Sequence, residues 1–142
     1  MKISARNQFK GTVTAVHPGA VNTEVIVNIG GGDSMVATVT HASLSAMRIA
    51  PGKEVIAMAK ASSVLLMTDA QGYVFSARNI LRGVVTEVTP GAVNAEVGVQ
   101  LAGGAVAHAM VTHQAITELG LEKGQSVMAV IKASSVLLAV PV

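Results

Sequence analysis

Apolar and polar residues follow two different periods along the first half of the chain. Five stretches are rich in Val, Ile and Thr and mostly alternate between apolar and polar positions, namely residues 9–16, 24–29, 34–40, 55–60 and 64–68. This period of two is typical of β-strands. Between the third and fourth stretches, Leu44, Met47 and Arg48 lie three and four residues apart, which predicts one or two helical turns over residues 41–49.

Turn-forming residues separate these elements. Pro18-Gly19 follows the first predicted strand, and Gly30-Gly31-Gly32-Asp33 predicts a hairpin between the second and third. Thr40 is a suitable N-cap for the helix, and Pro51-Gly52 ends it. The order strand, strand, strand, helix, strand, strand is typical of a small OB-type Greek-key barrel.

The same pattern occurs twice. Residues 4–67 align with residues 76–139 at a constant offset of 72, without a gap, and about half of the aligned positions are identical. We therefore predict an all-β protein of two tandem OB-like five-stranded Greek-key barrels, each with one short helix between its third and fourth strands. The predicted domains are residues 1–69 and 76–142, joined by a linker at 70–75. Because this linker is short, we expect the two halves to pack together.

Composition narrows the possible functions. Of the 142 residues, 51% are hydrophobic and only 13% charged, which favours extensive contacts in a homo-oligomer. The chain has no Cys, which rules out disulfides and thiolate chemistry and is compatible with a cytoplasmic location. The apolar stretches fall short of the ~20 residues that a membrane span needs. A net charge of +2 and only three aromatic residues, Phe9, Tyr73 and Phe75, argue against nucleic-acid binding.

Short polar clusters recur in both halves. They hold Arg6 and Lys60 in the first half, Arg78 and Lys132 in the second, and several hydroxyl side chains and small residues around them. These clusters contain no carboxylates, and a site rich in hydrogen-bond donors suits a small oxyanion. The alternative is that the cations are solvated surface charges and the Ser residues form turns.

These clusters resemble a known family. Ser-Ala-Arg-Asn, Gly-Ala-Val-Asn-x-Glu-Val, Val-Thr and Lys-Ala-Ser-x-Val occur in this order in each half, and together they resemble the Mop (molbindin) domain. Two such domains in tandem resemble a di-Mop molybdate-binding protein. The resemblance implies intracellular molybdate binding, storage and homeostasis, with tungstate as a surrogate ligand, in a cytoplasmic homo-oligomer that is expected to be a trimer.

The resemblance also implies the site residues. In this family the oxyanion is held at interfaces between domains, by side chains and backbone N–H groups of Ser4, Ala5, Arg6, Thr40, Ser43, Lys60, Ala61, Ser62, Ser76, Ala77, Arg78, Thr112, Lys132, Ala133 and Ser134. Ser43 is matched by Ala115, so the second half loses a hydroxyl and is expected to bind more weakly or to use Thr117. A further anion site on a symmetry axis is expected near Val21, Asn22, Val93 and Asn94.

Three other functions are compatible with a small chain of this kind to different degrees. An OB-type nucleic-acid module is disfavoured by the few aromatic residues. An enzyme is not expected, because no carboxylate pair suits acid/base catalysis and Glu24 and Glu96 each stand alone at a strand start. His41 and His113 could border the anion site, although residues of this kind more often form a hydrogen bond at a strand end. A molybdate-sensing or transport accessory module, acting with a partner protein, remains the closest alternative.

Overall fold

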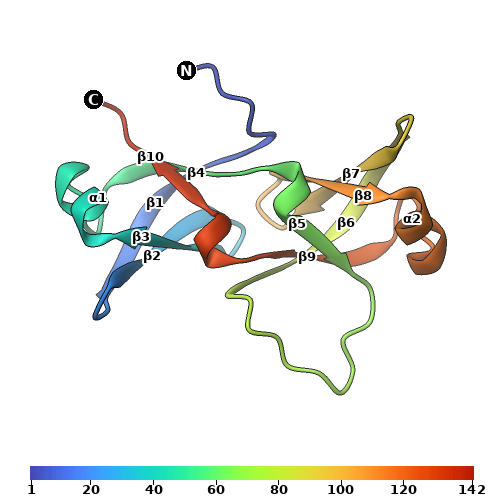
Figure 1. Cartoon of the computed structure of the whole chain (residues 1–142), viewed down its shortest axis with the longest axis horizontal. Coiled ribbons are helices and arrows are strands. Elements are labelled where there is room, and N and C mark those ends of the chain that lie inside the picture. The colour runs from blue at the N-terminus through green and yellow to red at the C-terminus, as the bar shows by residue number, and fades with distance from the viewer.

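The computed structural model describes all 142 residues and contains ten strands in two antiparallel sheets (Figure 1). The first repeat forms β1 (Asn7–Pro18), β2 (Asn22–Gly30), β3 (Asp33–Thr40), α1 (His41–Ala46), β4 (Glu54–Ala59), the 3-10 turn η1 (Ala61–Ser63) and β5 (Val64–Met67). The second forms β6 (Asn79–Pro90), β7 (Asn94–Leu101), β8 (Val106–Thr112), α2 (His113–Leu119), β9 (Ser126–Ile131), the 3-10 turn η2 (Ala133–Ser135) and β10 (Leu137–Ala139). The predicted all-β class and the helix between the third and fourth strands are confirmed.

The helices are short and begin at the predicted cap. The Thr40 hydroxyl accepts a hydrogen bond from the Ser43 N–H at 3.1 Å, which satisfies a free donor at the start of α1. Thr112 caps α2 in the same way. The first helix ends at Ala46, three residues before the predicted end, and the chain then turns through Arg48 with φ of 51°. The second helix ends at Gly120 with φ of 60°, a left-handed conformation that glycine adopts without strain.

Each sheet contains a strand from the other repeat. The strand orders are β10-β4-β1-β2-β3 and β5-β9-β6-β7-β8, so β10 pairs with β4 and β5 pairs with β9 (Figure 1). The sequence pattern predicted five strands per barrel but placed the fifth strand in the barrel of its own repeat. This placement of the fifth strand is wrong. The sequence could not distinguish the two pairings, because residues 64–66 and 136–138 are identical, Val-Leu-Leu. Either segment presents the same side chains to either sheet, so the pattern cannot say which pairing forms.

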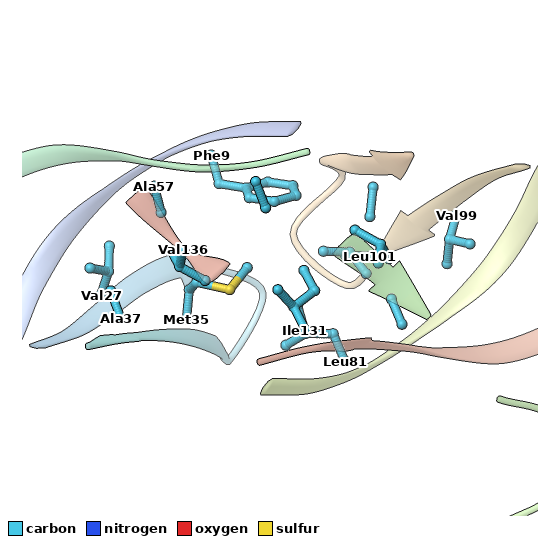
Figure 2. Packing of buried hydrophobic residues seen from close by; sticks show 14 of the residues in the cluster. Phe9, Val27, Met35, Ala37, Ala57, Leu81, Val99, Leu101, Ile131 and Val136 are labelled. Atoms are coloured by element: carbon cyan, nitrogen blue, oxygen red, sulfur yellow. The ribbon is translucent and has the colours of Figure 1, made fainter. Parts of the chain in front are cut away.

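The exchanged strands join the two halves around one core. Twenty-four buried apolar residues form a single cluster with members from both repeats. Figure 2 shows Phe9, Met35 and Val136 in the same continuous band as Leu81, Leu101 and Ile131. Val136 precedes β10 and is buried, and Leu138 within β10 is buried as well. The expectation that the two halves pack together is therefore confirmed.

Residues 68–78, between β5 and β6, form a loop that projects from the body of the molecule (Figure 1). Tyr73 and Val74 in this loop are exposed. None of the helices is long and apolar enough to cross a membrane.

Candidate functional site

The Ser-Ala-Arg-Asn and Lys-Ala-Ser segments of each repeat lie side by side. Asn7 at the start of β1 is the pairing partner of Ala59 at the end of β4. The next residues outward are Arg6 and Lys60, so the antiparallel geometry brings these two cations close together. Asn79 and Ile131 pair in the same way in the second repeat. The two predicted cationic clusters are therefore each assembled by one strand pair.

A buried asparagine anchors each cluster to the other repeat. The Asn7 amide accepts from the His108 N–H at 2.6 Å and donates to the His108 carbonyl at 2.8 Å. The Asn79 amide makes the same two bonds with Val36, at 2.6 and 2.8 Å. Both Asn side chains are fully buried. They satisfy backbone groups on the outer edges of β8 and β3, which have no neighbouring strand on that side.

The Lys-Ala-Ser segments pack onto the same two strands. η1 lies against β8, and η2 lies against β3. Ala61 and Ala133 are 4% and 6% exposed, and their small side chains allow this close approach. Lys60, Ser62, Lys132 and Ser134 remain exposed. Each cluster thus presents a cation and a hydroxyl to solvent, over a segment that is fixed to the opposite repeat.

Each arginine is paired with a carboxylate. Arg6 Nε and Nη2 lie 2.8 and 2.7 Å from Glu96 Oε1, and Arg78 Nη1 pairs with Glu24 Oε2. Glu24 and Glu96 therefore form ion pairs, which the sequence alone did not predict. The donor clusters contain no carboxylate in sequence, but the fold brings one to each arginine from the other repeat. The carboxylate engages Nε and Nη2 of Arg6 and Nη1 of Arg78, so an anion at either arginine meets a nearby negative charge.

The predicted hydroxyl donors of the helix caps lie apart from the cationic clusters. Thr112 ends β8, four residues beyond the His108 backbone to which Asn7 is bonded. At ~3.3 Å per residue this is about 13 Å along the strand. Thr40 ends β3, four residues beyond Val36, in the same relation to Asn79. Figure 1 shows α1 and α2 at opposite ends of the molecule, away from η1 and η2.

The two helix caps differ in their hydroxyl groups. The Thr40 hydroxyl donates to Ser43 Oγ at 3.0 Å, so two hydroxyls meet at the start of α1. In α2 the position of Ser43 is taken by Ala115, and only the backbone N–H of this residue reaches Thr112. The Thr117 hydroxyl, the predicted substitute, donates to the His113 carbonyl within the helix at 3.4 Å.

The remaining predicted residues occupy turns and strand ends. His41 Nδ1 lies 2.9 Å from the Thr23 hydroxyl, whereas His113 Nε2 lies 3.0 Å from the Gly91 carbonyl. Each histidine thus forms a local hydrogen bond next to a helix cap. Val21, Asn22, Val93 and Asn94 are exposed where β1 turns into β2 and β6 into β7. These two hairpins lie at opposite ends of the molecule (Figure 1), so the four residues do not meet within a single chain.

A known domain family matches each of the two repeats separately. The TOBE domain family matches residues 3–66 and again residues 76–138. The chain belongs to the TOBE domain family. The predicted resemblance to tandem Mop domains is confirmed, because the molybdenum-pterin-binding proteins MopA and MopB of Rhodobacter capsulatus each align with 99% of this chain.

Two relatives and one solved structure are particularly similar to this tandem TOBE protein. The molybdenum transport protein ModE of Herbaspirillum seropedicae is 44% identical over 140 residues, which are 99% of this chain and 52% of ModE. The molybdenum-pterin-binding protein MopA of Rhodobacter capsulatus is 41% identical over 141 residues, 99% of this chain and 53% of MopA. The chain thus spans about half the length of these relatives. The structure of the cytoplasmic molybdate-binding protein ModG with molybdate bound matches 99% of this chain and 100% of its own, with a TM-score of 0.96 and 57% identity.

The tandem TOBE protein offers donors suited to an anion. No group of three or more His, Asp or Glu side chains is arranged to hold a metal ion. Beside the paired Glu96 and Glu24, the polar groups of the two clusters are guanidinium, ammonium and hydroxyl groups, which can donate to an anion that carries its own oxygen shell. Sequence reasoning missed the anchoring role of Asn7 and Asn79 and the paired Glu24 and Glu96. Their recurrence at equal positions in the two repeats was the available signal.

Proposed function

We propose that this protein binds molybdate at its two Arg–Lys clusters and serves as an intracellular molybdate store. The observation that supports the proposal is the duplicated cluster, in which Arg6 and Lys60 adjoin the paired residues Asn7 and Ala59, and Arg78 and Lys132 adjoin the paired residues Asn79 and Ile131. It occurs in a chain that matches molybdate-bound ModG over its whole length. The description of ModG as cytoplasmic supports the same location for this chain.

The chemistry of the clusters fits a tetrahedral dianion. Molybdate already carries four oxygens, so the protein contacts oxygens and no side chain ligates the metal. Arg6 and Lys60 would supply charge-assisted hydrogen bonds, and the Ser4 and Ser62 hydroxyls and nearby backbone N–H groups would cover the remaining oxygens. Selectivity against the smaller sulfate would come from the size of the cavity. Tungstate is nearly the same size as molybdate and would bind similarly.

A second copy of the chain would complete each site. Within one chain Thr112 lies about 13 Å along β8 from the point where the Asn7 segment docks. We infer that Thr40 and Ser43, or Thr112, reach a cationic cluster from a neighbouring subunit. Three chains with two repeats each would close a ring with six such sites. Because each site would then span two chains, molybdate would stabilise the assembly by mass action.

Native mass spectrometry with molybdate, tungstate and sulfate tests the proposal. We expect a trimer that takes up several molybdate or tungstate ions and ignores sulfate. Lys132→Ala should reduce uptake, because it removes one cation from the second cluster. Lys123→Ala is the matched control, since Lys123 is also exposed but lies outside both clusters. A folded oligomer that retains neither heavier oxyanion would refute the proposal, as would equal losses in the two lysine variants.

A second candidate is a molybdate-sensing or transport accessory module. The half-length match to ModE favours it, because the aligned half could serve a partner region. The two functions differ in how much metal the protein holds. A store isolated from molybdate-grown cells should carry several molybdenum atoms per oligomer by elemental analysis, whereas substoichiometric molybdenum together with ligand-dependent binding to a partner would favour the sensor.

A further inference from the structure

One row of side chains differs in chemistry between the two repeats. In the second repeat, neighbouring positions on β6, β7 and β8 hold Glu87, Gly98 and His108. The equivalent positions on β1, β2 and β3 hold Ala15, Ile26 and Val36. An apolar row in the first repeat is thus replaced by an ionisable row in the second. This row lies beside the ion pair between Arg6 and Glu96.

Gly98 leaves space for the side chains of Thr86 and Glu87 on the neighbouring strand. A Cβ atom at this position would lie 2.7 Å from the Thr86 hydroxyl oxygen and 3.4 Å from Glu87 Cγ. The Ile found at the equivalent position could not fit here without displacing them. The His108 side chain is 22% exposed, and its Nδ1 lies 3.4 Å from Glu96 Oε1. Gly98 and His108 thus stand at facing positions of β7 and β8, where the first repeat has Ile26 and Val36.

His108 and Arg6 share one carboxylate oxygen. Glu96 Oε1 is contacted by Arg6 Nε at 2.8 Å, by Arg6 Nη2 at 2.7 Å and by His108 Nδ1 at 3.4 Å. In the other cluster Glu24 pairs with Arg78, and Val36 stands where the histidine would be. The two arginines are thus held by carboxylates in different surroundings.

We propose that His108 is a positioning residue for oxyanion binding, which sets how firmly Glu96 holds Arg6. This inference rests on the proposed function. Imidazole changes its charge between about pH 5 and 8. A protonated His108 gives Glu96 a second cationic partner, which weakens its hold on Arg6 and lowers the negative potential that a dianion meets. The Arg6 cluster therefore binds molybdate more tightly as the pH falls, while the Arg78 cluster lacks this response.

Several other charged or titratable groups lie on elements that pack against β8. They are Glu96 on β7, Lys10 and His17 on β1, and His113 and Glu118 on α2, while β5 carries none. Glu87 lies one strand further away on β6, and Arg6 and Lys60 flank the docked segments. No ion pair involves Glu87, Lys10, His17 or Lys60. The His113 ring is bonded to the Gly91 carbonyl. Glu96 is therefore the carboxylate through which the charge of His108 acts.

Isothermal titration with molybdate at pH 6.5 and 8.0 tests the inference. In the wild-type oligomer we expect one class of sites to tighten on the order of 5-fold at the lower pH, the effect of one nearby charge in partly hydrated surroundings. His108→Val, which places the residue of the first repeat at this position, should remove this response. His17→Thr is the matched control, since it places the residue of the second repeat at an exposed histidine elsewhere.

Glu96→Gln provides a second route to the same conclusion. It removes the carboxylate charge from Arg6, so binding should tighten at pH 8.0 and its pH dependence should shrink to the direct effect of the His108 charge. Protonation of the ligand itself affects every variant equally and cancels in the comparison. A pH response that persists in His108→Val, or that is shared by all sites, would overturn this inference alone. Failure of the wild-type protein to take up molybdate at either pH would instead overturn the proposed function, and this inference with it.

Discussion

The buried Asn79 side chain should be among the largest single contributors to stability outside the apolar core. Its amide forms two hydrogen bonds, of 2.6 and 2.8 Å, with the N–H and the carbonyl of Val36 on an outer strand. Asn79→Ala removes both bonds and leaves two backbone groups without partners. Asn79 is 1% exposed and Val36 is 7% exposed, so water reaches these groups poorly.

The expected loss follows from the free energies of such groups. Each hydrogen bond contributes about 1 kcal/mol net, and each buried group left unsatisfied costs about 1–3 kcal/mol. Partial entry of water lowers the sum, so we expect Asn79→Ala to reduce the free energy of unfolding by about 2–4 kcal/mol. Asn28→Ala is the control, because the Asn28 side chain accepts one exposed hydrogen bond, from the Gly30 N–H, and its loss should cost less than about 1 kcal/mol.

Urea unfolding followed by circular dichroism measures both variants. All proteins must be compared at one protein concentration and without oxyanion, because assembly and ligand binding raise the apparent stability. A value for Asn79→Ala within 1 kcal/mol of wild type, or equal to that of Asn28→Ala, would show that the Asn79 amide does not bridge Val36 as described.

Two further predictions concern the sheets. Gly83→Ala should destabilise the protein by about 2 kcal/mol or more, since the added Cβ would lie 2.6 Å from a backbone oxygen of the neighbouring strand. Thermal unfolding measures this loss. The control is Val84→Ala at the next, exposed position, which should change the midpoint of thermal unfolding little. The exchanged strand can be trapped in a chain without cysteine, because Ala57 and Leu138 are paired residues at a spacing that permits a disulfide. Ala57→Cys/Leu138→Cys should form an intrachain crosslink by non-reducing electrophoresis and intact mass, whereas Ala57→Cys/Leu66→Cys should not; the reverse result would indicate that each repeat keeps its own fifth strand.

Local signals in the sequence predicted the elements but not how the two repeats are joined. The period of two located the strands, and the chemistry of Thr40 located the start of α1. These features depend on neighbouring residues alone. The exchange of β5 and β10 depends on a choice between two segments that share Val-Leu-Leu, and the chain reaches the other sheet through η1, which lies against β8, and η2, which lies against β3. A hydrophobic pattern carries no information about that path.

The candidate site was predicted in its parts and missed in its assembly. Recurrence of Arg6 and Lys60 at equal positions identified the cationic clusters, and antiparallel pairing brings them together. Glu96 lies 90 residues from Arg6, so their contact depends on the packing of one repeat against the other. No spacing rule within a repeat could show that each arginine meets a carboxylate.

The strand exchange also explains why both repeats must be folded for either cluster to form. Lys60 leads directly into η1, which lies against β8, and the chain then enters the second sheet as β5. The Asn7 side chain fixes the other half of the same cluster to His108 on β8. The cations of the first repeat are therefore held by the sheet of the second, and the converse holds for Arg78 and Lys132. Loosening of one sheet would displace the cluster of the other repeat, so the geometry of both clusters depends on the folding of both repeats.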